Sequence, residues 1–352
     1  MARVWDVPVH DSTRLRDARL AVAEAAAAAG LDEARTAAAA LVATELATNL
    51  LKHADGGRLL LDVVPPPAPA EGGDPTRFVQ IAALDHGPGI ADVPAALDDG
   101  FTTASSLGAG LGTCRRVADT FALHSEPGRG TVAVAHIGPG TRDTAPAADC
   151  GVRAGGVSLP YGGAEHSGDA WTCVRSGDRV TLMLADGLGH GPQAAHASTA
   201  AVEALRRSAH LSPAESLDRL DAALRGTRGA AVAVAQVDTA GGTLRFAGLG
   251  NASAWLWEDG AWHCLLSRPG IVGVHRPRTF TDRSRAWGGD RVLLLHSDGL
   301  PGRRTPPSAP DLLSADPAVM ASVILRDSGS AARPPRDDTT VAVLSPAPQE
   351  GR

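Results

Sequence analysis

Two segments of the chain repeat one pattern, and each predicts a buried strand that ends at an acidic turn. GDRVTLMLADGLG (177–189) and GDRVLLLHSDGLP (289–301) align without gaps and share eight of thirteen residues. In both, a Gly-Asp turn precedes an apolar run, which is typical of a buried strand. The similarity has two explanations. Either two strands of one sheet share hairpin chemistry, or Asp186 and Asp298 leave adjacent strands and face a common centre.

Strand-length apolar runs recur throughout the segment that holds both copies. Two helical stretches, at about 192–208 and 214–225, interrupt them. This pattern predicts a strand-dominated α+β domain with a few helices on its faces. The expected strands are 171–175, 180–185, 231–238, 243–247, 252–257, 292–296 and 340–344.

The first half of the chain is organised differently. Helices are predicted at 12–29 and 32–54, because each is followed by glycine and the first has polar cap candidates before it. Helices that alternate with strands around one sheet predict an α/β or α+β unit. The strands expected here are 58–64, 78–84 and 131–137.

The length of 352 residues allows two domains. Residues 139–151 are short and lack periodicity, so they predict a linker between domains at 1–138 and 152–346. The formal charge of −6 predicts no broad attraction to nucleic acid or to anionic lipid. The four cysteines are far apart, which disfavours a disulfide framework or a zinc site. We expect a cytoplasmic protein with no membrane partner, because no signal peptide or spanning apolar run is present.

Acidic residues in the second half follow predicted strands or lie beside glycine. They are Asp169, Asp186, Asp298, and the pair Asp337 and Asp338. A single Asp-Gly is usually an ordinary turn, but four such sites in one domain suggest a common role. Clustered aspartates suit hard divalent cations, and a pair of such ions activates water for attack on phosphorus. The sequence therefore predicts a two-metal site.

The motifs SGDAW, LADGLGHG, GLGN, HSDGL and RDDTTVAVL occur in this order and resemble those of the SpoIIE/RsbX-type metal-dependent protein serine/threonine phosphatases. The resemblance implies a β-sandwich flanked by helices, with Mn²⁺ or Mg²⁺ at one edge. It also implies that Asp186 bridges both metals and that Gly187 offers a carbonyl. Asp298 and Asp337 would complete the second metal, with Asp169 among the ligands or just outside them. Of the adjacent Asp337 and Asp338, the family motif assigns the metal to the first, Asp337.

One position departs from the family. Larger relatives carry a histidine two residues after the bridging aspartate, where this chain has Leu188. His190 follows two residues later and is a candidate general acid for the leaving serine oxygen, because the pKa of histidine suits that task. The alternative is that His190 only caps the following helix.

In the second predicted helix, ELATNLLKHA places Glu45, Asn49 and His53 on one stripe. Such a stripe is usually a solvated face. Here it is followed by DHGPGI (85–90) and LGAGLGT (107–113). The first motif puts a carboxylate at a strand end, and the second leads glycines into a helix N-terminus, which favours phosphate.

These motifs resemble the ATP-binding boxes of the GHKL ATPase/kinase superfamily, and GRGT (128–131) is similar to the box on its last strand, which includes Thr131. The resemblance implies an N-terminal α/β sandwich that binds ATP, with Glu45 as general base, Asn49 holding Mg²⁺ and Asp85 accepting from adenine. ELATNLLKHA is closer to the RsbT-type kinases than to anti-sigma kinases of the RsbW type. The glycines would approach the base or cradle the phosphates; they are Gly87, Gly89, Gly108, Gly110 and Gly112.

The leading hypothesis is a bifunctional stress-response regulator that acts in sigma factor control. It would phosphorylate and dephosphorylate a serine or threonine of a STAS-domain partner, and a downstream regulatory phosphatase or anti-sigma factor is a further candidate partner. A second hypothesis treats the first half as an ATP-responsive docking module that transfers no phosphate. The retention of Glu45 favours catalysis. A non-catalytic scaffold is disfavoured because the aspartate set is complete.

Overall fold

The computed structural model describes residues 3–69, 76–97, 110–140, 150–277, 279, 281–300, 305–329 and 336–348. The chain divides into two compact units. The N-terminal unit comprises Val4–Pro66 and Thr76–Arg142, and the C-terminal unit comprises Asp143–Arg352 with Met1–Arg3 and Pro67–Pro75. Most of the predicted linker, 141–149, lies outside the described residues. In the part of the chain that the structure describes, no helix has the length and apolar character needed to cross a membrane.

The N-terminal unit is an antiparallel sheet in the order β1-β2-β3-β5-β4, with helices against one face. Its strands are β1 (Val4–Val9), β2 (Gly57–Val64), β3 (Phe78–Leu84), β4 (Thr120–Glu126) and β5 (Gly130–Ile137). Its helices are α1 (Arg14–Ala29), α2 (Glu33–His53), α3 (Val93–Leu97) and α4 (Leu111–Val117). Asp32 begins α2, since its side chain accepts a hydrogen bond from the Arg35 N–H.

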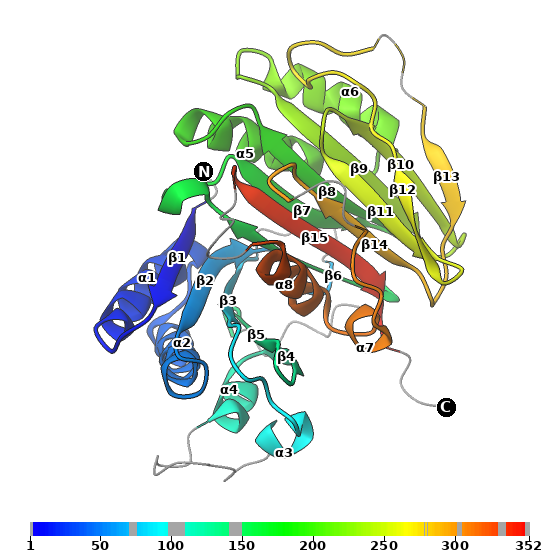
Figure 1. The fold of residues 1–352 in the computed structure, drawn as a ribbon. Coiled ribbons are helices and arrows are strands. Elements are labelled where there is room, and N and C mark those ends of the chain that lie inside the picture. Colours follow the sequence, from blue (N-terminus) through cyan, green and yellow to red (C-terminus); the bar gives the residue numbers. More distant parts are fainter. Residues whose placement is uncertain are drawn as a thin grey trace. The chain divides into compact units, whose positions relative to one another are not determined.

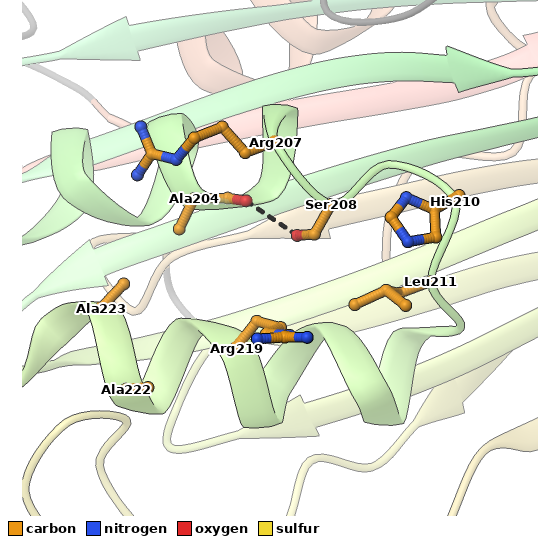
Figure 2. Close-up of a pocket in the computed structure, with 8 residues that line it drawn as sticks. All are labelled: Ala204, Arg207, Ser208, His210, Leu211, Arg219, Ala222 and Ala223. Carbon is orange, nitrogen blue, oxygen red and sulfur yellow. Dashed lines mark hydrogen bonds between the residues drawn. The ribbon is translucent and has the colours of Figure 1, made fainter.

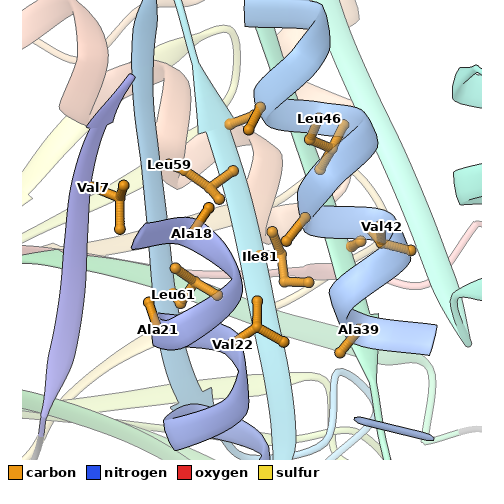
Figure 3. Close-up of a cluster of buried hydrophobic side chains, with 14 of the residues drawn as sticks. Val7, Ala18, Ala21, Val22, Ala39, Val42, Leu46, Leu59, Leu61 and Ile81 are labelled. Carbon is orange, nitrogen blue, oxygen red and sulfur yellow. The ribbon is translucent and has the colours of Figure 1, made fainter. Parts of the chain in front are cut away.

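Apolar side chains from α1 and α2 pack on the sheet and form the core of this unit (Figure 3). Val22 of α1 and Leu46 of α2 are buried together with Ile81 of β3. The opposite side of α2 carries the predicted stripe, so burial of one face directs the other toward solvent or a ligand.

The C-terminal unit contains two five-stranded antiparallel sheets with helices on the outer faces (Figure 1). The first sheet has the order β13-β10-β9-β8-β7, and α5 (Pro192–Arg206) and α6 (Pro213–Leu224) pack on it. The second has the order β12-β11-β14-β15-β6 and is covered by α8 (Pro317–Ser328). A 3₁₀ turn (Tyr161–Gly163) and α7 (Pro310–Leu313) complete the unit.

The strands of the first sheet are β7 (Asp169–Ser176), β8 (Arg179–Gly187), β9 (Ala230–Asp238), β10 (Thr243–Leu249) and β13 (Arg283–Ala286). Those of the second are β6 (Val152–Leu159), β11 (Ser253–Glu258), β12 (Ala261–Leu265), β14 (Val292–His296) and β15 (Thr339–Pro346). Because β15 contacts both β7 and β8, the two sheets pack face to face. The predicted α+β class with two domains and a C-terminal sandwich is confirmed.

The expectation that Asp186 and Asp298 leave adjacent strands is wrong. Asp186 ends β8 in the first sheet, whereas Asp298 follows β14 in the second. The repeated segments therefore occupy corresponding places in two layers, not neighbouring places in one. Helix α8 was also not predicted, although Asp316 caps it by accepting from the Ala318 N–H, and Pro317 follows as the first helical residue.

Candidate active sites

The pairing of β7 with β8 places two carboxylates side by side at one edge of the sandwich. In this antiparallel register Asp169 lies directly opposite Asp186. Asp169 is fully buried and Asp186 is half-buried at the end of its strand. The backbone of Gly187 runs so close to α5 that a Cβ there would lie 2.2 Å from the carbonyl oxygen of Ala194. Only glycine leaves this end of β8 in place.

The second sheet contributes its carboxylates to the same edge. Strands β14 and β15 are antiparallel neighbours, so the turn after one meets the turn before the other. These turns carry Asp298 and Asp337. A direct link between the sheets comes from Asp338, whose Oδ2 accepts from the Gly168 N–H at 2.8 Å, next to β7. The structure thus brings together carboxylates that are far apart in the sequence, and we call Asp169, Asp186, Asp298 and Asp337 the carboxylate cluster.

Burial and mutual repulsion disturb the titration of these groups. Burial, and then the charges of Asp298 and Asp337, raise the pKa of Asp186 to about 7. Burial and the charge of Asp186 hold the pKa of Asp169 well above its usual range. Carboxylates that repel one another in a partly dry site need a cation or protons for compensation.

One oxygen atom of the carboxylate cluster indicates that a cation binds there. The Oδ2 atom of Asp169 is buried and has no hydrogen-bond partner among the residues that the structure describes. A buried charged oxygen without a partner is costly, unless a metal ion supplies the missing interaction. An all-oxygen donor set of this kind suits Mg²⁺ or Mn²⁺.

The structure distinguishes the two aspartates of the RDDTT motif. Asp338 is buried, and both its oxygens are occupied, Oδ1 by the Tyr161 N–H at 2.7 Å and Oδ2 by the Gly168 N–H. Asp337 is half-buried, and the one hydrogen bond that it accepts from a described residue runs from the Asp338 N–H to Oδ1. Asp337 therefore retains free lone pairs toward the cluster, whereas Asp338 fastens the loop between β6 and β7.

Asn251 belongs to this site although no role was predicted for it. Its side-chain Nδ2 donates to Oδ2 of Asp298. Burial and the charge of Asp337 raise the pKa of Asp298, and this hydrogen bond partly opposes the rise. The signal in the sequence was the GLGN motif, which ends at this residue. An amide donor beside a carboxylate orients it, as the residues behind metal ligands commonly do.

His190 lies exposed on the loop between β8 and α5. Its ring centroid is 6.2 Å from that of Tyr161. Burial raises the pKa of Asp338, and the nearby His190 is among the groups that partly oppose this rise. The N-cap of α5 is Gly191, and no side chain caps that helix. The alternative role of His190 as a helix cap is therefore not what the structure shows.

A separate pocket of about 540 Å³ lies between the C-terminal end of α5 and α6 (Figure 2). Arg207, His210 and Arg219 contribute to its lining, and none of the predicted site residues does. The hydroxyl of Ser208 in this pocket donates to the carbonyl of Ala204 at 2.7 Å, so it is occupied by the helix end.

In the N-terminal unit, the predicted stripe lies on α2 with a gradient of exposure. Glu45 and Asn49 are half-buried, and His53 is exposed at the end of the helix. Burial raises the pKa of Glu45, and the ammonium of Lys52 partly opposes this effect. The charge of Glu45 in turn contributes, after burial, to the rise of the Cys114 pKa to about 12, so α4 lies beside this carboxylate.

Asp85 is buried at the end of β3 and is fixed by backbone groups. Its Oδ1 accepts from the Gly87 N–H at 2.8 Å and from the Thr131 N–H at 3.0 Å. Gly130 has φ of +89°, and a Cβ there would lie 2.2 Å from the carbonyl oxygen of Asp85. This close approach explains the second glycine in GRGT. Both hydrogen bonds that the Asp85 side chain accepts within the described residues go to Oδ1.

The glycines of the two predicted loops are partly placed. Gly89 has φ of +73° at the turn after Asp85. Gly110 is the N-cap of α4, and Gly112 is buried in its first turn. Gly108 lies outside the described residues.

Comparisons with known proteins match the two halves of the chain to different families. The model of the Stage II sporulation protein E (SpoIIE) family matches residues 176–346, and that of the histidine kinase-like ATPase domain matches residues 9–136. Serine/threonine-protein kinase RsbT of Bacillus subtilis (strain 168) is 38% identical over 101 residues, which are 29% of this chain and 68% of that protein. The chain belongs to the RsbT family. Its second half adds a SpoIIE-type serine/threonine phosphatase domain, so both predicted resemblances are confirmed.

Several solved structures are similar. RsbX in complex with magnesium is 19% identical with a TM-score of 0.46, covering 56% of this chain and 96% of that one. The phosphatase domain of SpoIIE from Bacillus subtilis with a regulatory fragment is 16% identical with a TM-score of 0.48, covering 97% and 98%. A structure from work on the bacterial stressosome is 27% identical with a TM-score of 0.49, covering 55% and 98%.

The two families have consequences for this chain. The phosphatase domain implies divalent metal ions, and the GHKL-type domain implies ATP. The chain combines the two domain types of partner-switching regulation.

Proposed function

We propose that this protein is a bifunctional partner-switching regulator. Its phosphatase domain removes phosphate from serine or threonine of a STAS-domain partner, and its RsbT-family half transfers phosphate from ATP to such a partner. The observation that carries the phosphatase half is the carboxylate cluster, in which Asp186 interacts electrostatically with Asp169 of its own sheet and with Asp298 and Asp337 of the other. Without bound cations or protons, these carboxylates repel one another and destabilise the folded state.

In this proposal Asp186 and the carbonyl of Gly187 would help to hold two Mn²⁺ or Mg²⁺ ions. Asp298 and Asp337 would complete the ligands of the second ion, and Asp169 would lie at or beside the first. When bound, these ions supply a water of lowered pKa and neutralise phosphoryl oxygens. Asn251 keeps Asp298 oriented.

Hydrolysis of a STAS-domain protein phosphorylated on serine or threonine tests the phosphatase half of the proposal. We expect the purified chain to release phosphate from it in the presence of Mn²⁺ or Mg²⁺ and to stop when EDTA removes the metal. Comparing the two ions identifies the preferred one. Retention of the phosphate with both metals present would refute the proposed substrate.

The role of His190 is to give a proton to the leaving serine oxygen. Its exposed ring, on the loop that follows Asp186, leaves it free to meet a substrate. We expect His190→Ala to slow phosphoserine hydrolysis by about 10²-fold, the usual range for a general acid. Hydrolysis of an aryl phosphate should fall much less, because that leaving group needs no proton.

The rates of phosphoserine and aryl phosphate hydrolysis are measured with one enzyme preparation at one pH. His196→Ala serves as the matched control, because His196 is an exposed histidine on the following helix. Equal losses on the phosphoserine and aryl substrates would contradict the acid role of His190.

The RsbT-family half is proposed to bind ATP over α2 and the end of β3, next to the start of β5. Asp85, held by the backbone of Gly87 and Thr131, accepts from the adenine amino group with its remaining oxygen. Asn49 holds Mg²⁺, and the glycines before α4 accommodate the phosphates. Glu45, four residues before Asn49, removes the proton from the attacking hydroxyl, and burial raises the pKa of its carboxyl, which makes the carboxylate a stronger base.

The alternative is a docking module that binds ATP without transferring phosphate. It requires Asp85, Asn49 and the glycines but assigns no task to the carboxylate of Glu45. The half-burial of Glu45 and the resulting pKa rise favour catalysis, since a partly buried acid without a role is an unnecessary cost.

A further inference from the structure

We propose that Arg228 binds the phosphate group of the phosphorylated serine or threonine at the carboxylate cluster. This inference rests on the proposed phosphatase activity and adds the residue that recognises the transferred group. No motif of the sequence pointed to this arginine.

The backbone around Arg228 is fixed next to the cluster. Arg228 lies in the turn between α6 and β9. The Thr227 hydroxyl donates to the Leu224 carbonyl at 2.7 Å and accepts from the Gly229 N–H at 3.0 Å. The Gly229 carbonyl then accepts from the Leu188 N–H at 3.0 Å. Arg228 is therefore held between the end of a helix and the loop that follows Asp186.

The side chain of Arg228 reaches across that loop. A Cβ built on Gly189 would lie 3.1 Å from Nη1 of Arg228. The carbonyl of Gly189 in turn lies 3.0 Å from the place of a Cβ on Gly168, whose N–H donates to Asp338. The guanidinium thus lies at the rim of the site, over the segment that carries Gly187 and His190.

The guanidinium of Arg228 is free to bind a ligand as far as the described residues are concerned. Arg228 is exposed, and among the described residues it has no hydrogen bond or ion pair. Neighbouring arginines differ: Arg225 lies 3.8 Å from Asp221, and Arg276 pairs with Asp221 at 3.1 Å. An exposed guanidinium without such a partner remains available for an anionic ligand.

A phosphate group can contact both the cations of the carboxylate cluster and the guanidinium of Arg228. A phosphomonoester presents three terminal oxygens, so it can contact cations in the cluster and a guanidinium at the rim together. The planar fork of arginine donates two parallel hydrogen bonds to phosphate, which the point charge of lysine does not reproduce. The rim position of Arg228 thus selects substrates by their phosphate group.

The test is the binding of inorganic phosphate to the full chain, measured by calorimetry in Mg²⁺. We expect Arg228→Ala to weaken phosphate binding by about tenfold or more, the loss for a hydrogen bond to a charged group. Arg228→Lys should recover part of the affinity. Arg225→Ala, an exposed arginine three residues away, is the matched control and should leave it unchanged. Affinity for Mg²⁺ alone should be the same in all four proteins.

Other outcomes overturn the proposal. Unchanged phosphate affinity in Arg228→Ala would refute it, as would a wild-type protein that binds Mg²⁺ but no phosphate. A parallel loss of Mg²⁺ binding in Arg228→Ala would assign the residue a structural role instead. Failure of the proposed function looks different: the wild-type protein would bind phosphate through Arg228 and yet hydrolyse no phosphoserine substrate.

Discussion

Asp186→Asn is expected to lower phosphoserine hydrolysis by about 10³-fold or more, because it removes the carboxylate proposed to bridge the two metals. The contribution of such ions to transition-state stabilisation is several kcal/mol, and each 1.36 kcal/mol or so corresponds to tenfold in rate. Asparagine has nearly the same shape, so the fold should remain. The measurement is Mn²⁺-dependent phosphate release. Asp178→Asn, in the turn before β8, is the matched control and should retain activity.

The same substitution should stabilise the metal-free protein at alkaline pH. The pKa of Asp186 rises from 3.8 to about 7 on folding, so the folded state holds a proton that the unfolded state has released. The stability of the metal-free wild type therefore falls as pH rises between these values. Asparagine has no proton to lose.

Thermal unfolding at pH 8 in EDTA checks this effect. Asp186→Asn should then unfold at a higher temperature than the wild type, and Mn²⁺ should raise the unfolding temperature of the wild type more than that of the variant. A folded, metal-loaded variant with full activity would contradict the two-metal assignment. A variant less stable than the wild type in EDTA would contradict the electrostatic account.

Glu45→Gln is expected to abolish most phosphate transfer and to leave ATP binding intact. Glutamine keeps the size of the side chain on α2 but does not accept the proton of an attacking hydroxyl. Loss of a general base costs about 10²–10⁴-fold in rate. Transfer to a STAS-domain protein is measured beside ATP affinity, with Glu33→Gln as an exposed control on the same helix. Equal transfer by Glu45→Gln and wild type would exclude Glu45 as the base.

Local signals in the sequence predicted the elements that carry both sites. The two N-terminal helices and the strand before Asp85 were expected close to their observed bounds, because caps, glycines and apolar periodicity are local. The spacing of aspartates at strand ends also predicted a cluster. Its arrangement was not predictable in the same way. Whether β8 and β14 share a sheet depends on long-range pairing, which two similar segments do not encode.

Residues that act through their tertiary neighbours were not identifiable from sequence. The family resemblance assigned the metal to Asp337 and not to Asp338, but the physical reason, the backbone donors at Tyr161 and Gly168 that occupy Asp338, is visible only in the folded chain. Asn251 stood in a recognised motif, but its partner Asp298 lies on another strand end. Arg228 follows an unremarkable helix, and its position over Gly189 exists only in the folded chain.

Label transfer from radioactive ATP tests the central claim of two opposed activities on one chain. The protein carries Asp186→Asn, so that no label is removed, and is incubated with Mg²⁺ and a STAS-domain protein from the same organism. We expect label on a serine or threonine of the STAS protein, its absence when Glu45→Gln is added, and its removal by protein with an intact Asp186. No label despite measured ATP binding would contradict the kinase assignment and leave the phosphatase as the enzyme of this chain.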